Sequence, residues 1–458
     1  MIPARMICRA GLVRSRAPGA ATFAAAFFGL LSLFAPAAQA VTIERIVSPG
    51  GIEAWLVRDA TVPLVTMRFA FKGGSSQDPP GKSGVANMVA SLLDEGAGNL
   101  DAKAFQERLE EQAIELRFED DRDHFRGSLR TLRDRREQAF DLLRLALTEP
   151  RFDADAVERI RGQLMAVLRR ESTDPSVLAQ QTWWSTAFPD HPYGRPEKGT
   201  PESVAKITTD DLRAYVRRVF ARATLKVAIV GDIDAAEAGL FLDRTFGALP
   251  PEAELEPVPQ AAPSGLGRRV VVKFDVPQAI VNIGSTGLPR NHPDFVAAYV
   301  VNHILGGGSF TSRLYQEVRE KRGYAYGIST YLYPMERTAL LMGWTQVRAD
   351  RTADSIAIIA QEMRQMAEKG PTAEELDKAK AYLKGSFALR FDSSDKIAAQ
   401  LVQIQIDNLG IDYINRRNDL IDAVTLEDAR RVARMLFDGR LLITIVGRPV
   451  GVTSSGPG

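Results

Sequence analysis

The histidines and the cysteine of this 458-residue chain are the first side chains to examine for metal or nucleophilic chemistry. His124, His191, His292 and His303 are scattered, and no two of them have the four-residue spacing that presents two zinc ligands on one helix. We therefore predict structural roles for all four. The only cysteine is Cys8, and no Gly-x-Ser-x-Gly turn occurs, so acyl-enzyme chemistry has no visible nucleophile.

The tripeptide Gly81-Lys82-Ser83 matches the end of a phosphate-binding loop. That loop needs a glycine five residues before Gly81, where Ser76 stands, and it follows a strand, whereas this tripeptide follows two prolines. Nucleotide binding is therefore not predicted. The formal net charge of +1, from 58 Lys plus Arg and 57 Asp plus Glu, gives no electrostatic signature of a nucleic-acid partner.

The elements that must position any functional side chains occur twice along the chain. Residues 207–231 have the pattern of an amphipathic helix, a short turn and a buried strand, and residues 424–447 repeat this order at an offset of 217. An earlier pair of segments, 105–110 and 315–320, matches at an offset of 210. Because both matches occur in the same order, we interpret the chain as an internal repeat.

Each half begins with two strands and two helices, continues with two strands and several long helices, and ends with a strand. The helix over 134–147 places Phe140, Leu143 and Leu147 on one face, as expected for packing on a sheet. We predict an α+β fold of two tandem homologous domains, each a mainly antiparallel sheet covered by helices. The opening elements are predicted at strands 53–58, 64–72, 270–274 and 279–285 and at helices 83–94, 102–112, 293–305 and 311–321.

The length exceeds what one ordinary domain needs, and the 45% hydrophobic content can supply two cores. A proline-rich and glutamate-containing stretch at residues 250–267 predicts an extended linker that can act as a hinge. We therefore predict a first domain over residues 41–249, a second over 268–450 and a flexible tail over 451–458.

The first 40 residues have the pattern of a secretory signal. Four arginines precede an apolar run at 20–34, and Ala38-Gln39-Ala40 forms a small-residue cleavage site. An uncleaved anchor is the alternative, but the apolar run is short for a membrane span. No later segment has enough consecutive apolar residues to cross a membrane, so stable membrane insertion is not predicted. We expect an exported protein, periplasmic in a Gram-negative bacterium, whose mature form has no cysteine because Cys8 lies in the signal.

Several motifs together resemble one family, the M16 (pitrilysin-like and insulinase-like) zinc peptidases, in the small-subunit class that includes mitochondrial processing peptidase. The resemblance extends over essentially the whole mature chain. The motifs that carry it are the tandem halves, Pro-Pro-Gly-Lys-Ser-Gly-Val-Ala at 79–86, Leu-Gly-Gly-Gly at 305–308, Ser-Arg-Leu-Tyr-Gln-Glu-Val-Arg-Glu-Lys-Arg-Gly at 312–323 and Arg-Gly-x-Ala-Tyr ending at Tyr326.

The resemblance implies that active members carry His-x-x-Glu-His directly after the first of these motifs, with two histidines on zinc and the glutamate activating water. In this chain the three positions hold Asn87, Ala90 and Ser91. The family's third ligand, a glutamate on a later helix, falls near Val167. Since none of these side chains is a suitable zinc ligand or base, we predict no zinc in this subunit and expect the metal in a partner subunit. The packing face of the same helix is kept, in Val85, Met88, Val89, Leu92 and Leu93.

The second half keeps a pair that the resemblance assigns to substrate and oxyanion binding, Arg319 and Tyr326. An arginine fork and a phenol can hold a peptide carbonyl and stabilise the oxyanion that forms during water attack. The position equivalent to Arg319 in the first half is Leu109, so the repeated fold does not require an arginine there. On residue type alone, Arg319 is an ordinary solvated charge on a charged helix.

The resemblance therefore favours a non-catalytic subunit of an exported heterodimeric M16 peptidase. It would pair with a homologous subunit that carries His-x-x-Glu-His, close the chamber, bind extended peptide and supply Arg319 and Tyr326 in trans. A structural core-type subunit and a stand-alone peptide-binding protein, homodimeric when its partner is absent, remain as alternatives. Independent peptidase activity is the least favoured interpretation.

Overall fold

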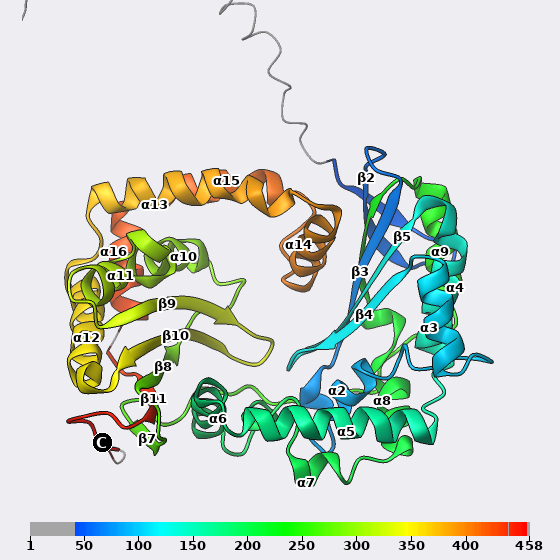
Figure 1. The fold of residues 1–458 in the computed structure, drawn as a ribbon. Helices are drawn as coiled ribbons and strands as arrows, with labels where there is room; N and C mark the ends of the chain where they lie inside the picture. The colour runs from blue at the N-terminus through cyan, green and yellow to red at the C-terminus, as the bar shows by residue number, and fades with distance from the viewer. Residues whose placement is uncertain (1–41, 438, 456–458) are drawn as a thin grey trace, which may run out of the picture. The chain divides into compact units, whose positions relative to one another are not determined.

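The computed structural model describes residues 42–437 and 439–455, in which two β-sheets follow one another along the chain (Figure 1). The predicted signal segment and Cys8 lie outside these residues. The compact unit considered below begins at Ile43. None of the helices in the described part of the chain combines the length and the apolar character needed to cross a membrane.

The first sheet has six strands in the order β1-β2-β6-β3-β5-β4. Strands β2 and β6 are parallel, whereas every other neighbouring pair is antiparallel. The predicted strands 53–58 and 64–72 coincide with β2 and β3. The strands are β1 (Glu44–Val47), β2 (Glu53–Arg58), β3 (Leu64–Lys72), β4 (Glu115–Asp120), β5 (His124–Leu132) and β6 (Lys226–Gly231).

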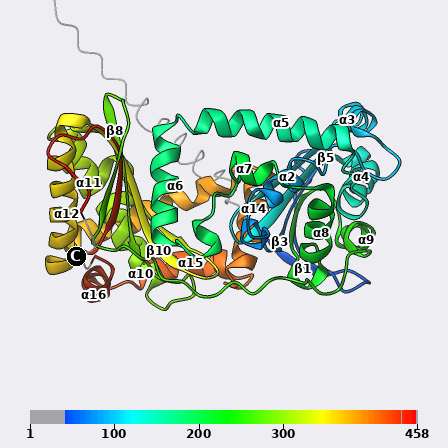
Figure 2. The ribbon, with the colours of Figure 1, turned by 90° about the horizontal axis from the view of Figure 1, so that it is seen from below.

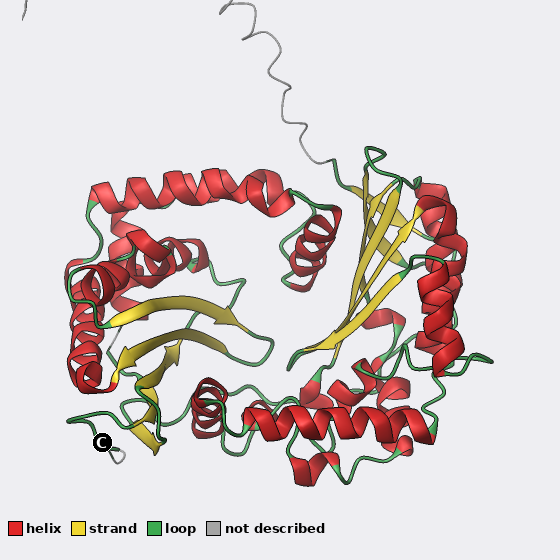
Figure 3. Ribbon diagram, viewed as in Figure 1, coloured by secondary structure: helices red, strands yellow, loops and turns green. Residues whose placement is uncertain are grey.

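The second sheet repeats the connectivity of the first in the order β7-β11-β8-β10-β9. Its parallel pair is β7 with β11, and the other pairs are antiparallel. The prediction of two mainly antiparallel sheets covered by helices is thus confirmed (Figure 3). The strands are β7 (Arg269–Lys273), β8 (Gln278–Thr286), β9 (Ala325–Pro334), β10 (Ala339–Arg348) and β11 (Leu442–Gly447).

The repeat extends to individual backbone details. Thr208 and Thr425, 217 residues apart, each cap a helix through a reciprocal capping box with an aspartate three residues later. The strands that follow these helices end at Gly231 and Gly447, whose φ angles are +142° and +150°. Glycine adopts this conformation without the steric cost that a Cβ would bring.

The helices cover the sheets, and one large hydrophobic core forms on each sheet, with two smaller clusters where α6 packs on the second sheet. Phe140, Leu143 and Leu147 of α4 are completely buried, as the predicted apolar face requires. The helices of the first half are α2 (Val85–Ala90), α3 (Ala102–Glu111), α4 (Arg136–Thr148), α5 (Ala154–Glu171), α6 (Pro175–Ala187), α7 (Pro201–Val204), α8 (Thr209–Val219) and α9 (Ala235–Phe246). Those of the second half are α10 (Phe295–Asn302), α11 (Arg313–Tyr315), α12 (Thr352–Lys369), α13 (Ala373–Gly385), α14 (Ser394–Ile406), α15 (Tyr413–Asp422) and α16 (Leu426–Leu436).

Three predicted helices are shorter or less regular than expected. The helix predicted over 83–94 is regular only in α2, after which backbone bonds of three-residue span tighten the chain into turns. The helices predicted over 293–305 and 311–321 each change from α to π geometry, at His303–Gly307 and at Gln316–Glu320. The first change brings Gly306 so close to β9 that a Cβ there would lie 2.4 Å from Thr330 Oγ1. Apolar periodicity does not report such close backbone approaches.

Two helices cross between the halves. Helix α6 of the first half packs on β11 and β8 of the second sheet, and α14 of the second half packs on β6 and β3 of the first sheet (Figures 1 and 2). The ring of Trp183 on α6 is fully buried against Gly284, and its Nε1–H donates to the carbonyl oxygen of Leu442. On α14, Asp395 accepts two hydrogen bonds from Arg68 of β3. Each sheet therefore needs a helix from the other half to complete its packing.

Residues 250–267, the range of the predicted linker, contain no helix or strand. They are nevertheless held at several points. The backbone of Glu256 exchanges two hydrogen bonds with the side chain of Gln77, and the backbone N–H of Ala261 donates to the carbonyl of Arg337. The linker is thus hydrogen-bonded to both halves.

Candidate functional site

The positions that the resemblance assigns to the zinc motif lie on α2 and at the residue that ends it. Asn87 donates its side-chain amide to Asp120 Oδ1 at the end of β4, over 3.1 Å. Ala90 is buried, and the hydroxyl of Ser91 donates to the carbonyl oxygen of Asn87 at 2.9 Å. The polar groups at two of the three positions are therefore occupied by bonds within the protein, and the third has no polar group.

The opposite side of α2 keeps the predicted packing face. Val85, Met88, Val89 and Leu93 are completely buried, and Leu92 is nearly so. The amino end of the helix is held by Asp78, which accepts from the backbone N–H groups of Gly84 and Ala86. The packing of the helix is thus intact, while its side chains at the positions of the zinc motif differ from those that the resemblance implies for active members.

The fourth degenerate position, Val167, lies half-buried on α5. This helix is joined to the turn after α2 by a two-bond ion pair between Arg159 and Glu95. In the two described stretches, no group of three or more histidine, cysteine or acidic side chains is placed to hold a metal ion. The residues present therefore do not fit a catalytic zinc ion.

Two buried carboxyl groups surround the amino end of α2. Burial raises the pKa of Asp78 to about 7, although hydrogen bonds from three backbone N–H groups oppose the rise. Burial likewise raises the pKa of Asp120 to about 8, and the nearby carboxyls of Asp78 and Glu197 raise it further, while Asn87 opposes the rise. Asp120 Oδ2 is sealed from solvent and has no hydrogen-bond partner. A neutral Asp120 at physiological pH follows from this environment.

Arg319 differs from the other cations of its segment. Arg313 forms two short hydrogen bonds with Glu375, and Arg322 pairs with Glu317 at 2.6 Å. The nearest carboxylate oxygen to Arg319 belongs to Glu320, at 3.9 Å, and its guanidinium lies over the ring of Tyr315. Its side chain is 38% exposed, whereas the equivalent Leu109 is buried. Arg319 is therefore available to another molecule.

Tyr326 lies on β9, the edge strand of the second sheet, and is 74% exposed. The register between β9 and β10 shifts beside it, because Ala325 pairs with Val347 whereas Ile328 pairs with Thr345. Two residues of β9 thus face one residue of β10. Such a bulge redirects a side chain locally, and edge strands with bulges are common next to functional sites.

A tight turn connects the two predicted site residues. Gly323, with φ +64°, donates its N–H to the carbonyl of Arg319, and Tyr324 donates to the carbonyl of Val318. Arg319 and Tyr326 therefore stand on either side of one turn, both accessible to solvent. Neither a hydrogen bond nor an ion pair joins them within the described residues.

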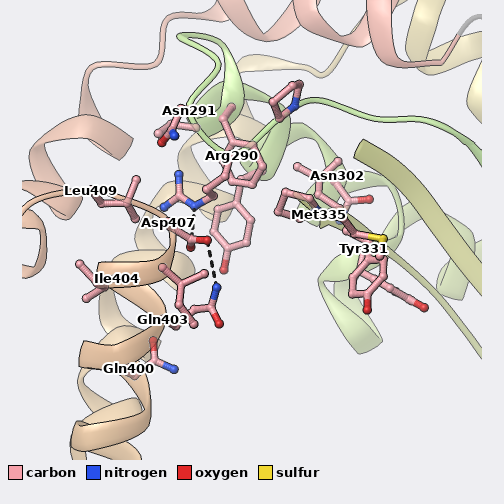
Figure 4. A pocket seen from close by; sticks show the side chains of 18 of the residues that line it. Arg290, Asn291, Asn302, Tyr331, Met335, Gln400, Gln403, Ile404, Asp407 and Leu409 are labelled. Carbon is pink, nitrogen blue, oxygen red and sulfur yellow. Dashed lines mark hydrogen bonds and ion pairs between the residues drawn. The ribbon is translucent and has the colours of Figure 1, made fainter. Parts of the chain in front are cut away.

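A cleft of about 820 Å³ lies between the halves and was not predicted from the sequence. Its walls come from β5, from β9 and the hairpin after it, and from α10, α14 and α15. In Figure 4, Arg290 and Asp407 point toward one another on one side, while Asn302, Tyr331 and Met335 lie on the other. The cleft also contains Arg417, which the sequence analysis did not single out. Its spacing of four residues from Tyr413 and from Ile421 was the available signal that it lies on an inward face.

Structural roles were predicted for all four histidines, and two of them accept hydrogen bonds from the backbone. His191 accepts from the backbone N–H of Tyr193 through Nδ1, and its Nε2 lies 3.0 Å from the carbonyl oxygen of Pro259. His292 accepts from the backbone N–H of Asp294. His124 and His303 are buried in the wall of the cleft.

Comparisons with known proteins agree with this architecture. A family model described as insulinase (peptidase family M16) matches residues 54–200, and one described as the peptidase M16 inactive domain matches residues 206–383. The chain is 29% identical over 330 residues to the non-peptidase homolog YmxG of Helicobacter pylori, covering 72% of this chain and 76% of that protein.

Two further similarities extend over nearly the whole chain. An uncharacterized zinc protease of Streptomyces coelicolor is 27% identical over 420 residues, which cover 89% of this chain and 90% of that protein. A crystal structure of a peptidase M16 inactive domain from Pseudomonas fluorescens superposes with a TM-score of 0.82 at 27% identity, covering 91% of this chain and 100% of the other. The two successive family matches, the repeated sheets and these relatives show that the chain belongs to the M16 (insulinase) family, as a member without the family's zinc motif.

Proposed function

We propose that this chain is the non-catalytic subunit of an exported heterodimeric M16 metallopeptidase. The observation that carries the proposal is a contrast between the halves. The positions that the resemblance assigns to the metal hold Asn87, Ala90 and Ser91, with Asn87 bonded to Asp120. The second half presents Arg319 and Tyr326 to solvent, and the nearest carboxylate oxygen to Arg319, that of Glu320, is 3.9 Å away. The zinc ion and the catalytic glutamate would then come from a homologous subunit that carries His-x-x-Glu-His.

Arg319 and Tyr326 would act on the partner's substrate. A guanidinium without a close carboxylate can donate to a peptide carbonyl, and a phenol hydroxyl can donate to the oxyanion that forms there. Their exposure supports this role, since a residue that acts in trans must reach beyond its own subunit.

The second sheet offers an extended peptide an edge on which to bind. Strand β9 is the last strand of this sheet, so within the described part of the chain its outer backbone groups have no neighbouring strand. Tyr331 and Trp344, both partly exposed, lie on β9 and on its neighbour β10. A peptide added as a further strand would gain backbone hydrogen bonds with modest sequence preference, as expected for a chamber that accepts many peptides.

The test is reconstitution with the candidate zinc-bearing subunit. Peptide cleavage and bound zinc are measured for this chain alone, for the partner alone and for the mixture. We expect cleavage only in the mixture and no stoichiometric zinc in this chain. Arg319→Ala is expected to lower kcat/KM of the mixture by about 10- to 100-fold, whereas Arg434→Ala, an exposed arginine on α16, is the matched control and should leave it unchanged.

Stoichiometric zinc together with cleavage by this chain alone would contradict the proposal. If mixing has no effect, a structural core-type role or stand-alone peptide binding replaces it. Export is tested separately, by determining the amino terminus of the protein recovered from the periplasmic fraction. We expect that terminus to be Val41.

A further inference from the structure

The cleft between the halves contains carboxylates that are already satisfied by the protein. Asp121 accepts from Arg126 at 2.9 Å, and Glu336 pairs with Lys72 at 2.8 Å. Asp123 accepts from the hydroxyl of Tyr193 and from a backbone N–H. The negative charges of this wall therefore have neighbours that balance or bind them.

The fourth carboxylate, Asp407, is balanced in the same way. It accepts from the side chain of Gln403 at 2.9 Å and faces Arg290 at 3.5 Å (Figure 4). Arg290 also donates to the hydroxyl of Tyr413 at 2.8 Å. The positive charge of Arg290 is thus matched by Asp407, and this pair adds no net charge to the cleft.

Two other guanidinium groups that line the cleft have no acidic partner among residues 42–437 and 439–455. Arg417 is only 6% exposed, and it donates to the carbonyl of Leu383 and to the side chain of Asn418. Arg390 is exposed and has no side-chain hydrogen bond or ion pair in the described residues. A buried charge without a counter-ion is energetically unfavourable. The side of the cleft that contains Arg417 and Arg390 therefore carries a positive charge that no acidic side chain in the described residues balances.

Aromatic rings hold Arg417 in place without neutralising it. Its guanidinium lies 4.0 Å from the ring centre of Phe387 and 5.9 Å from that of Tyr299. Burial lowers the pKa of Arg417, and the nearby positive charge of Arg390 lowers it further. Arg390 lies three residues after Phe387 and lines the same cleft as Arg417, so an anion bound there would face two cations.

We infer that this cleft binds a carboxylate group of the peptide, with Arg417 and Arg390 as its ligands. A planar guanidinium fork matches the two oxygens of a carboxylate, and the arginine held on aromatic rings is ordered before the ligand arrives. The site is separate from Arg319 and Tyr326, which do not line the cleft.

The inference rests on the proposed function, because it takes a peptide as the ligand. The carboxylate can belong to the carboxyl terminus of the peptide or to a glutamate or aspartate side chain, and the two sources share the same chemistry. The size of the cleft, about 820 Å³, accommodates several residues of a peptide. A terminal carboxylate bound here would set the distance between the end of a peptide and the partner's zinc.

The experiment measures binding of three labelled peptides to the purified chain by fluorescence anisotropy. They share one neutral sequence and end in a free carboxylate, in a carboxamide, or in a carboxamide with one internal glutamate. We expect the free acid to bind about tenfold more tightly than the neutral amide, the typical effect of one charge-assisted hydrogen-bond pair. If the internal glutamate restores tight binding, the site accepts either source, and if it does not, the site selects the terminus.

The variants are Arg390→Ala, whose side chain makes no described contact that folding needs, and Arg417→Lys, which keeps the charge but removes the fork. Each is expected to reduce the preference for the acid, while Arg364→Ala, an exposed arginine on α12, keeps it. Unfolding curves of all three show whether the fold is retained. Equal binding of acid and amide, no binding of any peptide, or a preference that survives both variants overturns the inference.

Inorganic phosphate and acetate are compared as competitors. Displacement by phosphate at concentrations where acetate has no effect would also overturn the assignment, in favour of a phosphorylated ligand. The proposed function has a separate readout, because cleavage by the reconstituted mixture does not require a carboxylate preference. If the free acid and the amide bind equally but the reconstituted mixture still cleaves peptide, only this inference is wrong and the proposed function stands.

Discussion

Asn87 donates a hydrogen bond from its side-chain amide to Asp120. The resemblance to active M16 enzymes places a zinc-binding histidine at the position of Asn87. The second oxygen of Asp120 has no partner and no access to solvent. An aspartate in this setting is stable when protonated and costly when ionised. Strand β4 therefore places beside α2 a carboxyl group whose protonation should affect the stability of the fold.

Replacing Asp120 with asparagine should flatten the pH dependence of stability. The pKa of Asp120 is raised to about 8 from the ordinary value of 3.8, so the folded state keeps a proton that the unfolded chain releases between these values. The contribution of protonated Asp120 to the free energy of unfolding is thus fully present below pH 4 and is lost as the pH rises through 8. At about 1.4 kcal/mol per pKa unit, the wild type should lose about 4 kcal/mol more than Asp120→Asn between pH 5 and pH 9.

The measurement is urea unfolding at several pH values within that range. Asp377→Asn, which removes an exposed carboxyl on α13, serves as the control and should follow the wild type. Parallel pH profiles for wild type and Asp120→Asn would show that Asp120 does not titrate in this way.

Trp183 should be among the most important residues for stability, because it packs α6 against the sheet of the other half. Its ring is completely buried against Gly284, and its indole N–H binds the carbonyl of Leu442. We expect Trp183→Ala to lower the free energy of unfolding by about 3–5 kcal/mol. Trp344→Ala removes the same kind of side chain from a site that is 47% exposed, and thermal unfolding should show a much smaller loss.

The ion pair between Arg68 and Asp395 should couple α14 to the first sheet. Its two bonds, of 2.7 and 2.8 Å, are partly exposed, so a double-mutant cycle with Arg68→Met and Asp395→Asn should give about 1 kcal/mol at neutral pH and low salt. The hydrogen bond from Arg68 lowers the pKa of Asp395, so this coupling is present above the ordinary pKa of 3.8 and disappears as the pH falls below it. A coupling that persists unchanged in 1 M salt, where the Debye length is about 3 Å, would contradict an electrostatic origin.

The hydroxyl of Tyr326, rather than its ring, should matter for cleavage by the reconstituted enzyme. Because this tyrosine is 74% exposed, Tyr326→Phe should change the free energy of unfolding by less than about 0.5 kcal/mol. The same variant should reduce kcat of the mixture by about tenfold or more if the hydroxyl binds the oxyanion. Tyr382→Phe, an exposed tyrosine on α13, provides the comparison, and equal rates for both variants would remove Tyr326 from the reaction.

The local pattern of the chain was sufficient for much of the fold. Strands β2 and β3 match the predicted bounds, and the buried face of α4 matches the predicted periodicity, because both follow from how neighbouring side chains alternate. The repeat was visible for the same reason, since Thr208 and Thr425 cap equivalent helices with the same local geometry. The π-helical turns at His303–Gly307 and Gln316–Glu320 were missed, since close packing against β9 is not a local property.

The sequence by itself determined that the positions which the resemblance assigns to the metal hold Asn87, Ala90 and Ser91, with Val167 near the last, because the type of a side chain fixes whether it can bind zinc. It also determined that Arg319 and Tyr326 are present. Only the tertiary structure decided that Asn87 is bonded to Asp120, that α6 and α14 cross between the halves, and that Arg390 and Arg417 line one cleft. These relations join residues far apart in the chain, and their energies depend on burial and distance, which arise only when the chain has folded.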